Sequence, residues 1–268
     1  MQLFDTHAHI GLIYDDPIKQ ISVIQQAKLA GVARIISINN SLVDFKKEYP
    51  FLKTQKGIYH AVGVGPSEVN TPGKDWIKTI EECVKLPRVV AIGETGLDYV
   101  KQYGDKRSQI ELFITQLELA QKYDLPVIIH NRGAGKDILE ILRDRIPAKG
   151  AVFHCYSEDD RYARQCLESG LNVYFSFAGN LTYRNARNLH DTIMELKDSG
   201  ATDRILIETE SPFMIPSEFR DKKRTMPAYL PSTAKFLAEM LETDLESLAA
   251  KLWTNSCRFF GLPEEKNH

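Results

Sequence analysis

Eight short runs of apolar and β-branched residues recur along the chain, and longer amphipathic stretches separate them. The runs are residues 3–6, 34–38, 58–64, 89–93, 126–130, 151–154, 172–177 and 204–208. Apolar runs of this length joined by helices predict buried parallel strands with helices packed against them. Eight such units favour closure into a (β/α)8 TIM-type barrel, an α/β fold, over an open doubly wound sheet.

The stretches between the runs have the apolar spacing of helices. The predicted helices are residues 17–30, 76–85, 106–123, 136–145, 159–169 and 189–198. In the third of these, Ile110, Phe113 and Leu117 share one face at spacings of three and four residues. We also expect two helices in residues 231–262, packed outside the barrel, and a frayed end at residues 263–268.

Length and charge limit the possible classes of protein. A chain of 268 residues is the size of one barrel domain, which we expect to span residues 1–268. The net charge is -2, so the chain lacks the excess of basic residues found in proteins that bind long stretches of nucleic acid. Any contact with nucleic acid should therefore be local. No signal peptide or membrane-length apolar run is visible. Four cysteines without a Cys-x-x-Cys pair suggest free thiols in a reducing cytoplasm. The sequence contains no feature that indicates an obligate protein partner.

Residue types that commonly bind metals lie at the ends of five of the predicted strands. They are His7 and His9 after the first strand, Glu94 after the fourth, His130 and His154 at the ends of the fifth and sixth, and Glu208 and Glu210 after the eighth. In a closed barrel these strand ends meet at the face where barrel enzymes place their active sites. Imidazole with carboxylate and no thiolate indicates a catalytic metal site. All of these except Glu208 are the predicted ligands, and six ligands are too many for one ion that keeps a water, so the sequence predicts two divalent metal ions (Zn, Mn, Mg or Fe).

A more ordinary explanation exists for each of these residues. A single histidine near a strand end is more often a hydrogen-bonded core residue than a ligand, and we interpret His60, His190 and His268 in that way. The pair His7 and His9 is stronger evidence for a metal site than a single histidine, because residues i and i+2 of a strand point to the same side of the strand.

These residues lie in stretches that resemble the TatD family of metal-dependent deoxyribonucleases, which belongs to the amidohydrolase-like barrels. The matching stretches are residues 4–9, 91–99, 125–132, 153–157, 175–179, 207–212 and 227–229, so the resemblance covers nearly the whole chain. It implies that His7 and His9 bind one cation, that His130 and His154 bind the other, and that Glu94 bridges them. Glu210 takes the place of the family's last ligand, an aspartate.

Other departures from the family pattern lie close to these motifs. Gly65 stands where the family usually has a histidine, and Gly11 stands where it has an acidic residue. Arg224 is kept, but Thr225 and Met226 replace its polar neighbours. These changes bear on substrate and efficiency more than on fold.

The sequence therefore predicts a metal-dependent hydrolase acting on ester bonds. The resemblance implies a deoxyribonuclease that removes nucleotides from single-stranded 3′ ends of DNA. Glu94 and Glu210 are the catalytic carboxylates, and Glu210 would orient a water or accept its proton. Arg132 and Arg224 are candidates for binding phosphate, since guanidinium groups bind it bidentately.

Several alternatives stay open. Arg132 could instead form a salt bridge at the barrel rim. Tyr99 or Tyr156 could stack on bases, or both could be core residues. The same metal chemistry would serve an amide or ester hydrolase of a small metabolite. Gly65 and Glu210 also fit a weakened metal-binding homologue with a regulatory role.

Overall fold

The computed structural model describes residues 1–101 and 103–264, which divide into two compact units. The terminal unit comprises Met1–Ser37, Cys155–Gln165 and the described part of Phe175–His268. The middle unit comprises Ile38–His154 and Cys166–Tyr174. Each unit is described by itself below, and a single domain over residues 1–268 stays a prediction.

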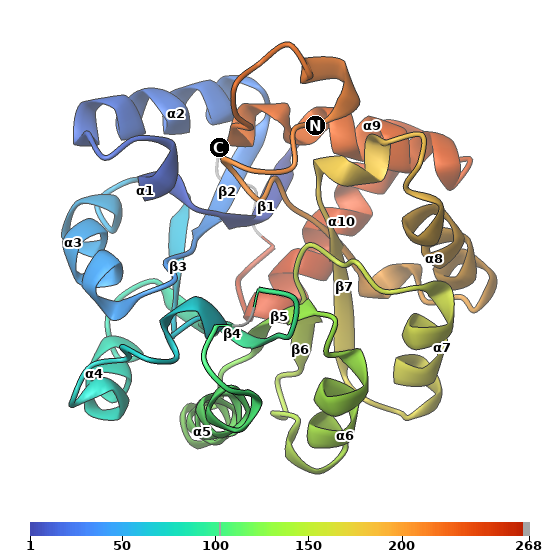
Figure 1. The fold of residues 1–268 in the computed structure, drawn as a ribbon. Coiled ribbons are helices and arrows are strands. Elements are labelled where there is room, and N and C mark those ends of the chain that lie inside the picture. Colours follow the sequence, from blue (N-terminus) through green and yellow to red (C-terminus); the bar gives the residue numbers. More distant parts are fainter. Residues whose placement is uncertain (102, 265–268) are drawn as a thin grey trace. The chain divides into compact units, whose positions relative to one another are not determined.

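Strands and helices alternate along the described chain (Figure 1). The strands are β1 (Leu3–Ala8), β2 (Val32–Ser37), β3 (Ile58–Val62), β4 (Val89–Asp98), β5 (Val127–Arg132), β6 (Ala151–Phe153), β7 (Val173–Phe177) and β8 (Ile205–Ile207). The helices are α1 (Ile10–Ile13), α2 (Pro17–Leu29), α3 (Leu42–Leu52), α4 (Trp76–Cys83), α5 (Lys106–Tyr123), α6 (Gly135–Arg145), α7 (Asp160–Glu168), α8 (Arg187–Asp198), α9 (Leu230–Met240) and α10 (Leu245–Phe260). Each predicted strand overlaps one of the observed strands, which confirms the α/β class.

The middle unit is built on four parallel strands, in the order β3, β4, β5 and β6. Helices α3 to α6 lie outside these strands (Figure 1). Helix α5 begins where the Asp105 carboxylate accepts the Ser108 amide at 3.0 Å, and it buries Phe113 and Leu117 completely. Burial of this apolar face is what fixes α5 against β4.

The terminal unit contains two parallel pairs, β1 with β2 and β7 with β8. Ala8 at the end of β1 also pairs with Ser211, which joins β1 to the loop after β8. Helix α10 covers β1 and β8, with Phe4 of β1 against the rings of Trp253 and Phe260. Helices α9 and α10 confirm the prediction of two helices in residues 231–262.

Three strands extend further than the sequence indicated. Strand β1 reaches Ala8, β4 reaches Asp98, and β5 reaches Arg132, so Glu94 and His130 lie inside strands and not at their ends. We expected β4 to stop at Gly93, because glycine interrupts the apolar run. It continues because Gly93 (φ 149°) and Gly96 (φ 140°) adopt extended backbone that residues with a Cβ rarely reach.

Smaller differences concern the helices and the chain end. Helices α1 and α3 were not predicted. Helix α3 contains Pro50, and a proline at that position usually indicates that a helix is interrupted. The frayed end expected at residues 263–268 is wrong for Glu264, which accepts hydrogen bonds from Trp253 and Thr254 on α10. Residues 265–268 lie outside the described residues.

The four cysteines are free thiols. Among the described residues, no helix combines the length and the apolar character needed to cross a bilayer.

The close approach of β4 to β5 gives a test of the fold. A Cβ on Gly96 would lie 2.0 Å from the His130 carbonyl oxygen, and the φ of 140° is itself strained for alanine. We expect Gly96→Ala to lower the free energy of unfolding by about 2 to 4 kcal/mol in urea denaturation. Gly65→Ala is the control, because Gly65 has a φ of -68° and a Cβ there would meet no atom closer than 3.6 Å. Equal losses in the two variants would contradict this account.

Candidate functional site

The terminal unit brings three of the predicted ligands together. His7 Nε2 lies 3.2 Å from His9 Nε2 and 3.1 Å from Glu210 Oε2, and His9 Nε2 lies 3.8 Å from the same oxygen. All three side chains are buried. We call this set the terminal cluster.

Backbone pairing explains how Glu210 reaches the two histidines. The Glu210 amide donates to the His7 carbonyl at 2.9 Å, and the His9 amide donates to the Ser211 carbonyl at 2.9 Å. Glu210 itself has a left-handed backbone, with a φ of 54°. The loop after β8 is therefore tied to the end of β1 on both sides of the glutamate.

A buried carboxyl group behind the cluster strengthens that tie. Asp5 on β1 accepts hydrogen bonds from the Thr209 amide (2.9 Å), the Thr209 hydroxyl (2.6 Å) and the His7 amide (3.3 Å). Burial raises the pKa of Asp5 to about 8, although the hydrogen bonds from Thr209 oppose the shift. In the metal-free protein burial thus favours the protonated form of Asp5.

Glu208, which the sequence placed at the end of the eighth strand but not among the six predicted ligands, is a further buried carboxylate. Its Oε1 accepts the Cys155 amide at 2.8 Å. His7, Glu208 and Glu210 each offer a ligand atom, and these atoms lie within 4.8 Å of one another. The position of Glu208 directly after the apolar residues of β8 was the signal in the sequence that could have identified it.

The middle unit brings together the other three predicted ligands. Glu94 Oε1 lies 2.9 Å from His130 Nδ1 and 3.3 Å from His154 Nε2, and the two ring nitrogens are 3.3 Å apart. Glu94 and His154 are buried, and His130 is partly exposed. We call this set the middle cluster.

Asp98 contacts the middle cluster and was missed by the site prediction. Its Oδ2 lies 3.3 Å from His130 Nε2, on the opposite side of the ring from Glu94. Burial acts to raise the pKa of Asp98, but hydrogen bonds from His130 and from the Lys101 and Val100 amides bring it below its usual value. A signal was present in the sequence, because residues i and i+4 of a strand share a side and Glu94 and Asp98 have that spacing.

The donor atoms fit divalent cations. A metal with bonds of about 2.1 Å to nitrogen and oxygen holds neighbouring ligand atoms about 3.0 to 3.4 Å apart. The separations in the middle cluster are 2.9 to 3.3 Å, and two of the three in the terminal cluster are 3.1 and 3.2 Å. Imidazole with carboxylate is also the donor set of catalytic zinc, manganese and iron sites. Each cluster could therefore hold a cation.

The two predicted phosphate-binding arginines differ in their surroundings. Arg132 ends β5, is exposed, and forms no ion pair with any residue in 1–101 or 103–264, so a rim salt bridge is not found there. Arg224 is half-buried, donates to the Ile13 carbonyl, and lies over the Tyr14 ring at 5.0 Å.

The tyrosines proposed for base stacking are both engaged in the fold. Tyr156 is buried, with its ring against Phe175 and Phe177, so it is a core residue. The Tyr99 hydroxyl donates to Asp137 at 2.7 Å. The Lys106 ammonium also lies over the Tyr99 ring, 4.8 Å from its centroid.

The histidines outside the clusters behave as core or hydrogen-bonded residues. His60 packs edge-on to Phe45 and Tyr49, and burial lowers its pKa to about 3, so it is neutral. His190 Nε2 lies 2.8 Å from the Leu181 carbonyl oxygen. His268 lies outside the described residues.

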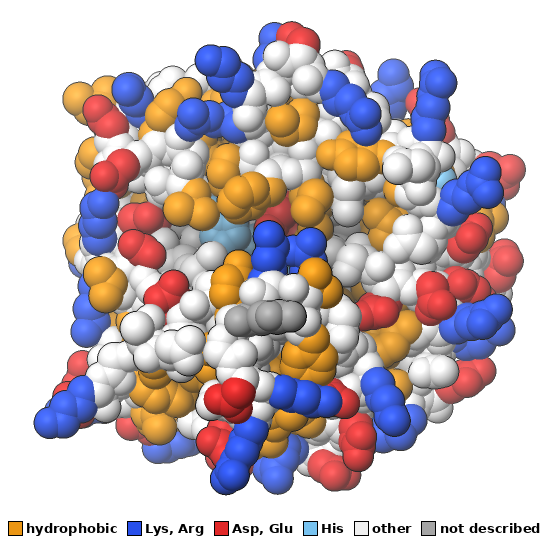
Figure 2. Space-filling model, viewed as in Figure 1, with side chains coloured by type: hydrophobic (Ala, Val, Ile, Leu, Met, Phe, Trp, Pro, Cys, Tyr) orange, Lys and Arg blue, Asp and Glu red, His pale blue; other side chains and the backbone are white. Residues whose placement is uncertain are grey.

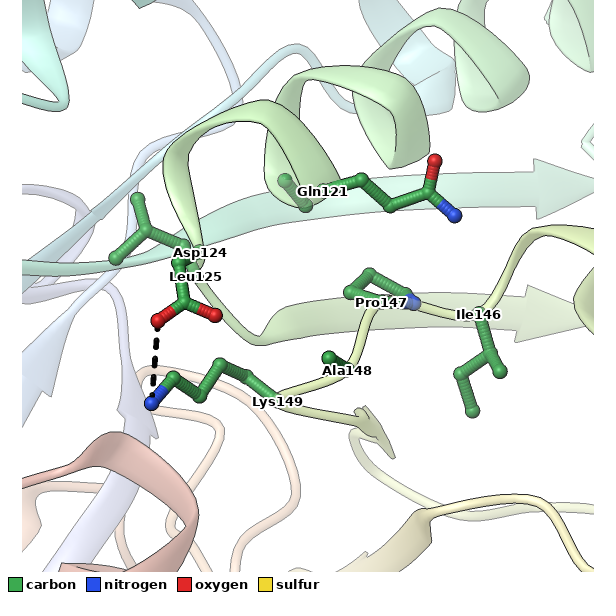
Figure 3. A pocket seen from close by; sticks show the side chains of 8 residues that line it. Gln121, Asp124, Leu125, Ile146, Pro147, Ala148 and Lys149 are labelled. Atoms are coloured by element: carbon green, nitrogen blue, oxygen red, sulfur yellow. Dashed lines mark ion pairs between the residues drawn. The ribbon is translucent and has the colours of Figure 1, made fainter.

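The middle unit also contains a pocket of about 310 Å³, and Figure 3 shows the side chains that line it. It is lined by residues that precede β5 and β6, where the strands begin, whereas His130 and His154 lie toward their carboxyl ends. Its charged groups, Asp124 and Lys149, form an ion pair at 3.3 Å. Nothing in this pocket resembles a catalytic set.

Comparison with known proteins gives concordant results. The sequence profile of the TatD-related DNase family matches residues 4–261. An uncharacterized metal-dependent hydrolase of Bacillus subtilis, YabD, is 35% identical over 96% of this chain and 98% of its own length. A protein of Citrobacter rodentium named 3′-5′ ssDNA/RNA exonuclease TatD is 30% identical over 90% of this chain and 91% of its own length.

Solved structures agree with the fold. The crystal structure of YjjV, a TatD homologue from Escherichia coli, matches with a TM-score of 0.86 and 26% identity, covering 97% of this chain and 98% of YjjV. This agreement confirms the predicted (β/α)8 TIM-type barrel with extra C-terminal helices.

The environment of Asp5 predicts that the free energy of unfolding depends on pH. The unfolded chain loses this proton near the ordinary pKa of 3.8, whereas the folded, metal-free protein keeps it until about pH 8. The folded state binds more protons between these values, so the stability from protonated Asp5 is complete below 3.8 and is lost as the pH rises through 8. We expect the stability of the wild type relative to Asp5→Asn to fall by up to about 1.4 kcal/mol per pH unit within this window.

Urea denaturation in the presence of a chelator, at pH 5 and at pH 8, measures this difference. The amide of Asp5→Asn does not titrate, so it provides the pH-independent reference. A difference between the two proteins that is the same at both pH values would show that Asp5 is ionised throughout.

Proposed function

Because this chain belongs to the TatD-related DNase family and is a metal-dependent hydrolase, we propose that it removes nucleotides from the 3′ end of single-stranded DNA. The observation that carries the proposal is the pair of clusters, each with imidazole and carboxylate donors at metal-ligand separations. The name of the Citrobacter rodentium relative supports the choice of substrate.

In this proposal His7, His9 and Glu210 hold one divalent cation, and Glu94, His130 and His154 hold another. A bound divalent cation lowers the pKa of its water toward about 7 and polarises a phosphoryl oxygen. The nitrogen-rich donor sets favour zinc, manganese or iron over magnesium, which prefers oxygen. The role of Glu94 as a carboxylate shared by two cations stays a prediction.

The chain's own residues supply positioning and proton transfer. Glu210 is held by the backbone of His7 and can orient a water or accept its proton. Arg224 has five N–H donors on a rigid plane, and the contacts with Ile13 and Tyr14 fix that plane while leaving donors for a phosphate. Arg132 is exposed and forms no ion pair within the described chain, so it is the second phosphate-binding residue we propose.

Phe213 takes the stacking role that we had considered for the tyrosines. Its side chain is 50% exposed, and its ring meets His9 of the terminal cluster edge-on, with centroids 6.2 Å apart. The Thr225 amide donates to the Pro212 carbonyl at 2.9 Å, so the chain segment next to Arg224 lies beside Phe213. Hydrophobic side chains gather on the surface near α1 and the loop after β8 (Figure 2). An exposed ring beside a hydrolytic centre suits a nucleobase.

The direct test is hydrolysis of a 5′-labelled single-stranded oligonucleotide in the presence of Mn²⁺, Mg²⁺ or Zn²⁺. We expect stepwise shortening from the 3′ end by the wild type. Glu210→Gln should lower kcat by at least about 100-fold, because an amide cannot accept the proton and is a weaker ligand. Glu218→Gln changes an exposed glutamate in the same loop and should keep full activity.

Two other outcomes would favour the alternatives. Turnover of small esters, lactones or amides without release of nucleotides would identify a hydrolase of small metabolites. Less than one equivalent of bound cation, together with no activity on either substrate class, would identify a weakened homologue.

Replacement of Phe213 tests the stacking proposal separately. Stacking of a base on an aromatic ring contributes about 1 to 3 kcal/mol, so Phe213→Ala should raise KM for the oligonucleotide by roughly 5- to 100-fold with little change in kcat. Phe213→Trp keeps an aromatic face and should retain a KM close to the wild-type value. If both variants match the wild type, Phe213 does not contact the base.

A further inference from the structure

We propose that Asp98 is a positioning residue that keeps His130 in the tautomer protonated at Nε2, so that Nδ1 presents its lone pair to a cation. The proposal rests on one part of the proposed function, the binding of a cation by the middle cluster. It does not depend on the substrate.

His130 lies between two carboxylates that face opposite nitrogens of its ring. Glu94 Oε1 is 2.9 Å from Nδ1, and Asp98 Oδ2 is 3.3 Å from Nε2. A neutral imidazole carries one hydrogen, on one nitrogen or the other. A histidine ligand binds a metal through the nitrogen without the hydrogen. The choice between Nδ1 and Nε2 therefore decides whether His130 can be a ligand with Glu94.

His130 is distinct from the other cluster histidines in the nitrogen that it presents. His7, His9 and His154 approach their cluster partners through Nε2. His130 approaches Glu94 and His154 through Nδ1. It alone requires the hydrogen to be on Nε2, and Nε2 is the atom that Asp98 faces.

The fold holds the Asp98 side chain in the orientation that this role requires. Its Oδ1 accepts the Val100 amide at 2.9 Å and the Lys101 amide at 2.8 Å, which leaves Oδ2 for His130. Gln109, itself buried, accepts the Asp98 amide at 2.8 Å and donates to the Asp98 carbonyl at 3.1 Å. The backbone and one carboxylate oxygen are thus fixed independently of His130.

With a cation between Nδ1 and Glu94, the hydrogen of the neutral ring lies on Nε2. The Asp98 carboxylate faces that nitrogen at 3.3 Å and can accept this hydrogen but has none to donate, so it favours the tautomer that binds the cation. A carboxylate behind a histidine ligand also fixes the ring and makes the ligand nitrogen more basic, and its loss costs about 10- to 100-fold in metal affinity.

The competing explanation is that Asp98 only closes the turn at Val100 and Lys101. Asp98→Asn separates the two roles. The asparagine Oδ1 can still accept both amides, while its NH2 group takes the place of Oδ2 and donates to Nε2. His130 would then carry its hydrogen on Nδ1, facing Glu94.

The experiment has two readouts that do not involve catalysis. Calorimetric titration of the metal-free protein with Zn²⁺ should show that Asp98→Asn weakens one binding step by about 10- to 100-fold and leaves the other unchanged. Long-range ¹H–¹⁵N spectra of the Zn²⁺-loaded proteins should show His130 bound through Nδ1 and protonated at Nε2 in the wild type, and should not show this pattern in Asp98→Asn. The control is Asp105→Asn at the start of α5, which contacts Ser108 and should change neither readout.

Either of two results would overturn the proposal. One is wild-type zinc affinity at both steps in a folded Asp98→Asn protein. The other is a Zn²⁺-loaded wild type in which His130 does not bind through Nδ1 with its hydrogen on Nε2, a result that needs no variant and so decides the question even if Asp98→Asn fails to fold. The titration contains no DNA, so a failure here leaves the nuclease proposal standing, and loss of nuclease activity would not affect this result.

Discussion

Close packing of imidazole nitrogens and carboxylate oxygens in each unit is the constraint on which the rest of the structure depends. In both clusters the facing atoms carry lone pairs and lie about as far apart as the ligands of one metal ion. Lone pairs held this close in a buried place repel unless a proton or a cation lies between them. The two clusters therefore favour the binding of positive ions.

Each unit holds its cluster with backbone and buried polar groups. In the terminal unit, pairing of β1 with the loop after β8 fixes Glu210, and Asp5 fastens the same loop through Thr209. In the middle unit, Glu94 and Asp98 on one strand approach the two sides of His130 on the next. Both arrangements bring together residues that are distant in the sequence or on separate strands.

The sequence predicted the elements well, because they depend on local pattern, and alternating apolar runs identified the eight strands. The histidines and glutamates beside those runs are the side chains that come together in the two clusters, and their role as ligands stays a prediction. The limits of β4 were wrong, since glycine usually ends an apolar run and here permits the strand to continue. Contacts beyond the local pattern were missed: Asp98 beside His130, and the exposed ring of Phe213 beside His9. For Tyr156 the sequence left open a stacking role and a place in the core, and its contacts with the Phe175 and Phe177 rings show that it is a core residue.

The most direct test of the central claim is anomalous diffraction from crystals loaded with Mn²⁺ or Zn²⁺. We expect one peak about 2.0 to 2.3 Å from His7 Nε2, His9 Nε2 and Glu210, and a second at a similar distance from Glu94, His130 Nδ1 and His154 Nε2. Crystals loaded with either metal that show no peak at these residues, or peaks only elsewhere on the protein, would contradict the account.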